Sequence, residues 1–105
     1  MNNLELLNEI KEKLLLNFPG IIEKVVLFGS QAKGNALDDS DYDILVIVGK
    51  NYDWQLKNKL IDLIYDFDLK YNIFTDVKII SKEELNTVKG KQPFIQNALE
   101  FGIIV

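Results

Sequence analysis

The chain has 105 residues, 48% of them hydrophobic, and a formal net charge of −4 at pH 7. This length predicts one compact domain over residues 1–105, and the negative charge disfavours DNA, whose phosphates must be neutralised by basic side chains. The absence of cysteine and histidine excludes disulfides and thiolate metal sites, so any metal must be a hard cation held by oxygen.

The basic residues restrict how the chain can bind phosphate, and the N-terminus indicates where the protein is located. All 12 basic residues are lysine, so phosphates must be bound by backbone N–H groups, hydroxyls, lysine or metal rather than by guanidinium groups. The first ten residues lack the pattern of a signal peptide, and no stretch has the roughly 18 consecutive apolar residues of a membrane span. We therefore expect a soluble, cytoplasmic protein.

The first predicted element is a helix over residues 4–14, where apolar side chains recur at helical spacing. Asn2 can cap this helix, and a Pro-Gly pair ends it. The apolar run Val25–Phe28 then predicts a strand buried on both faces. A short helical turn is expected over residues 30–35, directly after that strand.

The middle of the chain predicts a second strand, the longest helix and a third strand. The second strand is expected at Tyr42–Val48, after a polar connection over residues 38–40. The helix is expected at Trp54–Tyr71, because apolar residues recur on one face and Asp53 can cap it. Ile73–Ile80 is predicted to form the third strand.

The last quarter predicts two further helices and an apolar tail. Ser81–Glu84 has the capping-box pattern that starts a short helix ending near Gly90, and a final helix is expected at Pro93–Phe101. The tail, residues 103–105, needs cover, which favours association with a second copy or a partner. Strands alternating with helices predict an α/β (α+β) fold with a small mixed sheet of three to four strands flanked by helices.

Gly29 and Ser30 stand where a buried strand gives way to a helical turn. Free backbone N–H groups at such a turn can bind a phosphate, and the glycine allows the phosphate to approach closely. The serine hydroxyl adds a further donor. A Gly-Ser pair that stands alone at the end of a strand is more often a plain turn.

Three aspartates form the second candidate group. Asp41 and Asp43 are two residues apart at the start of a strand, so their side chains share a face. A divalent ion would relieve their repulsion, whereas a solvated acidic turn is the alternative. Asp76 lies inside a predicted strand, where aspartate is disfavoured, so it either ligates the same ion or pairs with Lys78.

Other phosphate and metal motifs fit less well. Gly29–Gly34 has the glycine spacing of a P-loop, but Asn35–Ala36 replaces its Lys-Ser/Thr pair. An EF-hand is excluded because Ile44 and Lys50 replace its turn glycine and bidentate glutamate. An Asp-x-Asp motif also holds the metal of some glycosyltransferases, but the upstream Gly-Ser pair points away from that class.

Taken together, the motifs resemble the DNA polymerase β-like nucleotidyltransferases, whose signature is Gly-Ser, a short helix, Asp-x-Asp and a third Asp on a later strand. Here the signature reads Gly29–Ser30, Asp41-Tyr42-Asp43 and Asp76, and the resemblance covers essentially the whole chain. The chain is most similar to the minimal nucleotidyltransferases, often encoded as antitoxins of an all-helical HEPN ribonuclease. That group usually has two arginines where this chain has Gln31 and Lys33.

The resemblance implies that Asp41, Asp43 and Asp76 are catalytic and hold two Mg2+ ions, while Gly29 and Ser30 bind the nucleotide. It implies the transfer of a nucleoside monophosphate, AMP from ATP, to a hydroxyl of a protein partner such as a HEPN-type protein. Two alternatives stay open. One is a catalytically weak antitoxin that acts by binding, which the missing arginines favour, and the other is transfer to a small molecule or an RNA end.

Overall fold

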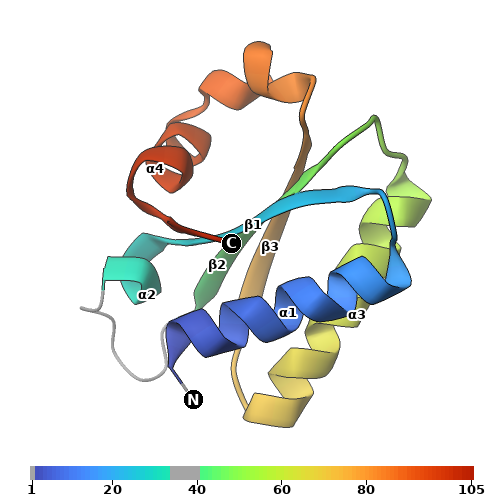
Figure 1. Ribbon diagram of the computed structural model, residues 1–105. Helices are drawn as coiled ribbons and strands as arrows, with labels where there is room; N and C mark the ends of the chain where they lie inside the picture. The colour runs from blue at the N-terminus through green and yellow to red at the C-terminus, as the bar shows by residue number, and fades with distance from the viewer. Residues whose placement is uncertain (1, 34–40) are drawn as a thin grey trace.

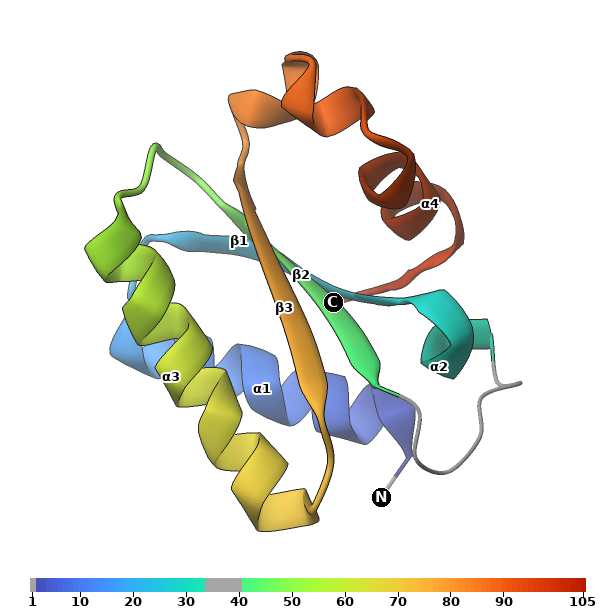
Figure 2. The same ribbon diagram turned by 180° about the vertical axis from the view of Figure 1, so that it is seen from behind.

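The computed structural model describes residues 2–33 and 41–105. They form a four-stranded sheet with the order β3–β2–β1–β4, in which β2 is parallel to β3 and β1 is antiparallel to β2 and β4. Two long helices cover one face and a shorter helix covers the other (Figures 1 and 2). The predicted mixed α/β sheet is therefore confirmed.

The elements are α1 (Asn3–Asn17), β1 (Ile22–Phe28), α2 (Gly29–Lys33), β2 (Tyr42–Val48), α3 (Trp54–Tyr71), β3 (Thr75–Ser81), 3-10 helices η1 (Glu84–Asn86) and η2 (Lys89–Lys91), α4 (Pro93–Phe101) and β4 (Ile103–Ile104).

The two long helices begin with side-chain caps that the sequence predicts. The Asn2 side chain accepts a hydrogen bond from the Glu5 N–H at 2.8 Å, and Asp53 accepts one from the Leu56 N–H at 2.8 Å. Each cap satisfies a backbone donor that the first turn of a helix leaves free. Asn72 ends α3 in the left-handed conformation, with φ of 54°. These caps fix where α1 and α3 start and end beneath the sheet.

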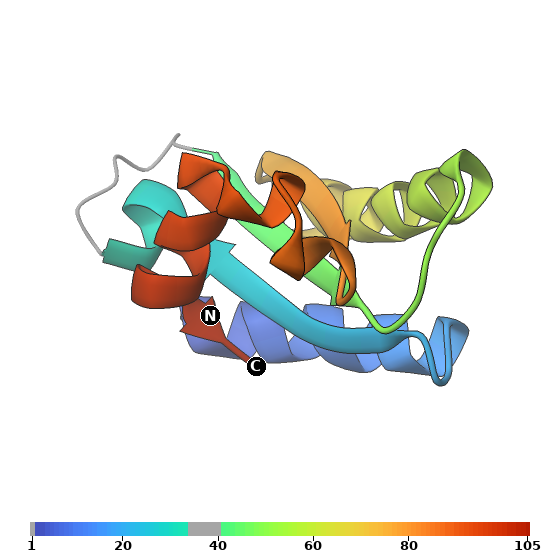
Figure 3. The same ribbon diagram turned by 90° about the horizontal axis from the view of Figure 1, so that it is seen from above.

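The central strands are buried on both faces because the two helical layers share them. Val25 and Leu27 of β1 pack toward α1 and α3, whereas Val26 and Phe28 pack toward α4. Figure 3 shows α4 and the 3-10 helices as a layer over that second face. The alternation of side chains along a strand places successive residues in different cores. The predicted doubly buried strand is confirmed, and it extends back to Ile22.

The segment after β3 differs from the predicted short α-helix. The capping box does form, since Glu84 N–H donates to Ser81 Oγ at 3.1 Å and Ser81 N–H donates to Glu84 Oε1 at 3.0 Å. However, Thr87 adopts an extended conformation after a single 3-10 turn, and a second 3-10 turn follows. The expectation of one continuous helix was wrong because a capping box starts a helix but does not sustain it.

The apolar tail is covered by strand pairing. Ile103 and Ile104 form β4, which pairs with Leu27 and Val26 of β1. Ile104 nevertheless remains 41% exposed, so the predicted association with a second copy stays a prediction.

The helical turn expected after β1 is present as α2. Residues 34–40, where the sequence predicts the end of this turn and a polar connection, lie outside the described residues. No helix in the described part of the chain combines the length and apolarity that crossing a membrane requires.

We expect Leu14→Ala to lower the free energy of unfolding by about 2 to 5 kcal/mol, because it opens a cavity in the core. Leu14 is fully buried in α1, whereas Leu16 of the same helix is 82% exposed. Leu16→Ala is therefore the matched control and should change stability by no more than about 0.5 kcal/mol. Urea unfolding measures both, and equal losses would contradict the described packing of α1.

Candidate active site

Gly29 and Asp43 meet where β1 ends and β2 begins. Phe28, the last residue of β1, pairs with Asp43 in the antiparallel ladder, and Gly29 follows it with φ of +74°. A Cβ atom on Gly29 would overlap the Asp43 carboxylate. Only glycine combines this left-handed backbone with such a close approach. The structure thus brings the predicted phosphate-binding turn directly against one of the predicted metal ligands.

Asp76 joins the same site from the other side of β2. In the parallel ladder Asp43 pairs with Asp76, so both side chains lie on the same face of the sheet. It is the face on which Leu45 and Ile47 pack against α4 further along β2. Asp41 is exposed and lies two residues upstream of Asp43. Two of the three predicted aspartates are therefore direct neighbours across strands, and the third lies close by in sequence.

The electrostatics of this group differ from those of ordinary surface carboxylates. Burial raises the pKa of Asp43, and the negative charges of Asp76 and Asp41 raise it further. Lys78 opposes this effect and lies 3.5 Å from Asp76, with both side chains about half exposed. The ion pair considered for Asp76 therefore exists, but it does not neutralise the group. Among the described residues, Lys78 is the one cation whose charge acts on Asp43, against those of Asp76 and Asp41.

The donor set suits a hard divalent cation. The side chains are carboxylates, the ligands that Mg2+ prefers, and burial together with the charges of Asp76 and Asp41 disfavours the ionised form of Asp43, which raises its pKa. Among residues 2–33 and 41–105, no group of three or more acidic side chains is gathered closely enough to hold a metal ion as it stands. The assignment of Asp41, Asp43 and Asp76 as ligands thus stays a prediction.

The turn after Gly29 carries the remaining predicted nucleotide-binding residue. Ser30 is exposed at the start of α2, where its hydroxyl is accessible to a ligand. The Asn3 side chain donates to the Gln31 carbonyl at 2.9 Å, which ties α2 to the start of α1. This contact fixes the turn relative to the sheet. The side chain of Lys33 lies outside the described part of the chain.

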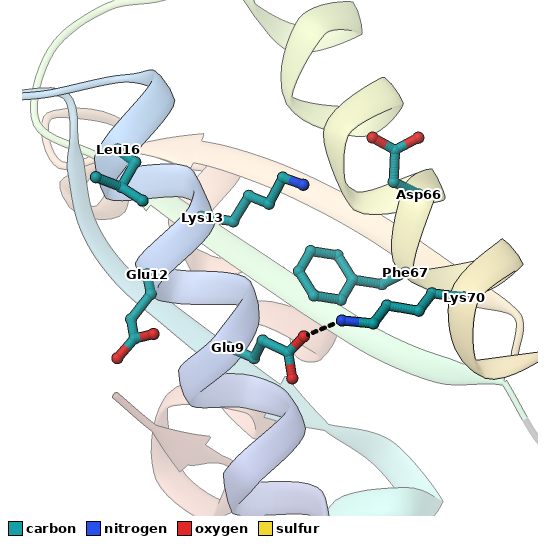
Figure 4. Close-up of a pocket in the computed structure, with 7 residues that line it drawn as sticks. All are labelled: Glu9, Glu12, Lys13, Leu16, Asp66, Phe67 and Lys70. Atoms are coloured by element: carbon teal, nitrogen blue, oxygen red, sulfur yellow. Dashed lines mark hydrogen bonds and ion pairs between the residues drawn. The ribbon is translucent and has the colours of Figure 1, made fainter.

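A separate hollow lies on the opposite side of the sheet, between α1 and α3 (Figure 4). It has a volume of about 240 Å³. A Glu9–Lys70 ion pair of 2.9 Å crosses it, and the Tyr71 hydroxyl also donates to Glu9. The hydrogen bonds from Lys70 and Tyr71 lower the pKa of Glu9, so these two neighbours compensate the charge of its carboxylate. The hollow contains none of the predicted site residues and joins two packed helices. Its lining residues are Glu9, Glu12, Lys13, Leu16, Asp66, Phe67 and Lys70.

Phe74 lies beside the aspartates although sequence reasoning did not single it out. Its carbonyl accepts a hydrogen bond from the Tyr42 N–H at 2.8 Å, which extends the ladder beyond β3. Its side chain is 70% exposed. The available signal was its spacing of two residues from Asp76, which places both side chains on one face.

Comparisons with known proteins agree with this geometry. Residues 6–104 match the family described as Nucleotidyltransferase domain. Two proteins of Methanocaldococcus jannaschii, MJ0604 and MJ0141, are 33% and 30% identical to the chain. Each alignment covers 100% of this chain, with 99% of the first protein and 100% of the second. Both relatives carry the provisional name of protein adenylyltransferase.

Solved structures share the fold. Spectinomycin adenyltransferase AAD(9) from Enterococcus faecialis, solved with ATP and spectinomycin, has a TM-score of 0.62 and 27% identity, with 81% of this chain and 36% of that chain covered. A toxin–antitoxin structure with AMP-PNP has a TM-score of 0.62 and 24% identity, with 92% of this chain and 69% of that chain covered. The predicted nucleotidyltransferase fold is confirmed.

Substitution of Gly29 tests the close approach to Asp43. Gly29→Ala places a methyl group on the carboxylate and should abolish the stabilisation by ATP with Mg2+, about 10 °C in Tm at a hundredfold excess over Kd. Gly20→Ala is the matched control, because Gly20 also has positive φ, +76°, but has open space around it. Both variants bear the left-handed strain of about 1 to 2 kcal/mol. Thermal unfolding that gives both variants the same ligand-induced shift would refute the contact.

The raised pKa of Asp43 predicts a pH-dependent penalty on stability. The carboxyl binds its proton more tightly in the folded state, so the free energy of unfolding falls as pH rises from its unfolded pKa through the raised folded pKa. Without ligands, Asp43→Asn should remove that fall and be more stable than the natural chain at pH 7, by about 0.5 kcal/mol or less, because solvent screens the charges around a partly buried carboxyl. Asp62→Asn, on the exposed side of α3, is the control. Unfolding curves from pH 3 to 8 that keep the same slope in Asp43→Asn would contradict this assignment.

Proposed function

Because the chain belongs to the nucleotidyltransferase domain family, we propose that it transfers AMP from ATP to a hydroxyl group of a protein partner. The observation that carries this proposal is the convergence of Gly29, Asp43 and Asp76 from three neighbouring strands. A phosphate-binding turn directly beside paired carboxylates is the arrangement that metal-assisted phosphoryl chemistry requires.

Each residue of the site has a distinct role in the proposal. Gly29 and Ser30 bind the terminal phosphates, so the leaving pyrophosphate lies on the β1 side. Asp41 and Asp43 would hold Mg2+ together with the triphosphate, and Asp76 would complete the ligands on the side of the acceptor. Two Mg2+ ions, when bound, neutralise charge on the leaving group and favour the deprotonated acceptor hydroxyl. Positioning and charge compensation provide most of the catalysis.

The transfer is a single in-line displacement at the α-phosphorus of ATP. The acceptor oxygen forms a bond to that phosphorus while the bond to the bridging oxygen breaks, and its electron pair leaves with pyrophosphate. The hydroxyl proton passes to Asp76 or to solvent. Because Asp76 is half exposed beside Lys78, its carboxylate is accessible to an incoming hydroxyl.

The names of the relatives support ATP as donor and a protein as acceptor. Two archaeal relatives that match this chain end to end are named as protein adenylyltransferases, and a toxin–antitoxin structure with the same fold contains AMP-PNP. We propose a HEPN-type helical protein as the acceptor, in an antitoxin role. Transfer to a small molecule is the second candidate, because spectinomycin adenyltransferase shares the fold, although this chain spans only 36% of that enzyme.

Binding without catalysis is a further alternative, since Gln31 and Lys33 stand where the resembling antitoxins usually have arginines. Lysine keeps the positive charge of arginine, whereas glutamine does not. In that case the chain would neutralise its partner by contact alone. The alternative predicts a stable complex and no covalent change in either protein.

The test is incubation of the chain with α-labelled ATP, Mg2+ and the product of the neighbouring gene. We expect one AMP, measured by intact-protein mass, on the partner. Asp41→Asn with Asp43→Asn should lower transfer by at least about 100-fold, because the metal ligands are lost. Asp62→Asn with Asp66→Asn removes two exposed carboxylates of α3 and is the charge-matched control. A complex with no mass change would support the binding-only antitoxin instead.

A further inference from the structure

The side of the site formed by β3 is open. Helix α4 packs on Val26, Phe28 and Leu45, toward the β1 side of the sheet. At the start of β3, by contrast, side chains on that face are exposed, as the alternating burial of residues 74–78 shows. A molecule that approaches Asp76 from this side meets no packed element among the described residues.

The geometry of the reaction gives this open side a role. Asp43 lies between Gly29 at the end of β1 and Asp76 on β3. If the triphosphate binds at Gly29, pyrophosphate leaves toward β1, and an in-line attack must come from the opposite direction. The acceptor hydroxyl therefore arrives over β3. This step rests on the function proposed above.

The free edge of β3 is not well suited to adding an acceptor strand. The Asp68 carboxylate accepts hydrogen bonds from the Thr75 N–H at 3.2 Å and from its hydroxyl at 2.8 Å. The Tyr52 hydroxyl donates to the Ile79 carbonyl at 2.9 Å. Side chains thus occupy backbone groups near both ends of the edge, a common protection against strand pairing. The acceptor must rest on the face of β3, where the side chains are available.

Two side chains on that face flank Asp76. Phe74 is 70% exposed, and Lys78 has 49% of its side chain exposed. An aromatic ring that is this exposed offers a stacking or apolar contact. The only ion-pair partner of Lys78 in the described structure is Asp76, at 3.5 Å. When Asp76 ligates a cation, Lys78 is repelled by that cation and left to pair with an anion on the incoming molecule.

We propose that Phe74 and Lys78 form the acceptor-binding surface, and that they select an acidic protein segment. In that segment the reacting hydroxyl neighbours an aromatic or apolar side chain, which packs on Phe74, and a carboxylate, which pairs with Lys78. Phe74 and Lys78 are positioning residues. They hold the hydroxyl over Asp76 and do not take part in proton or phosphoryl transfer.

The test compares two defined acceptors, random copolymers of glutamate with tyrosine and of lysine with tyrosine, using α-labelled ATP and Mg2+. The natural chain should label the acidic copolymer preferentially. Phe74→Ala should raise KM for it about tenfold, the size of a lost aromatic contact, with little change in kcat. Lys78→Glu should reverse the preference between copolymers. Phe101→Ala, also at an exposed phenylalanine, and Lys59→Glu, on α3, are the matched controls.

Thermal stabilisation by ATP with Mg2+ separates the outcomes. It should be unchanged in Phe74→Ala, because that side chain contacts the acceptor and not the nucleotide. Unchanged KM in both variants, or a preference of the natural chain for the basic copolymer, overturns the acceptor surface. Labelling of the partner protein but of neither copolymer overturns it too, while leaving the proposed function intact. If neither the partner nor a copolymer is labelled, the proposed function fails and this inference fails with it.

Discussion

The structure depends on the two-sided pairing of β2. This strand pairs antiparallel with β1 and parallel with β3, so its first residues are held between the end of one strand and the beginning of another. Because the ladders fix the register, Phe28, Asp43 and Asp76 lie in one row across the sheet. A shift of one residue would turn every side chain of a strand to the other face and would disperse the site. The same register fills both cores.

The candidate site lies directly before the buried part of β2. Apolar residues of β2 from Ile44 onward are buried, whereas Asp43 precedes them and keeps a raised pKa among like charges. Gly29 leaves room for the same carboxylate because it has no side chain. A glycine loses more backbone freedom on folding than other residues, which reduces stability. Residues held close for function often reduce stability in this way. The buried remainder of the strands compensates for this cost.

The two faces of the sheet differ in how completely helices cover them. The face beneath α1 and α3 is closed by packing, and even its hollow is spanned by the Glu9–Lys70 pair. The other face is covered by α4 only in part, which leaves the start of β3 accessible. The proposed transfer makes use of this asymmetry, because it brings two reactants to the site from opposite directions. On the accessible side an aromatic ring and an ammonium group flank Asp76.

The local elements were predictable because they follow from short-range physics. Helical spacing, the caps at Asn2 and Asp53, and the apolar run of β2 fixed three elements closely. The aspartates could also be recognised, since aspartate is unusual within strands, and the Gly-Ser pair became informative through its position before them. Where local preferences compete, the sequence was insufficient to predict the secondary structure. At residues 84–91 two 3-10 turns replace the expected helix.

Sequence alone determined which residues are candidates for the site, whereas only the tertiary structure decided how they meet. Strand order and register depend on contacts between distant segments, so the pairing of Asp43 with Asp76 cannot be derived from local pattern. The collision that makes glycine necessary at position 29 exists only once β1 and β2 are paired. Likewise, the exposure of Phe74 just before β3 depends on how the layers pack.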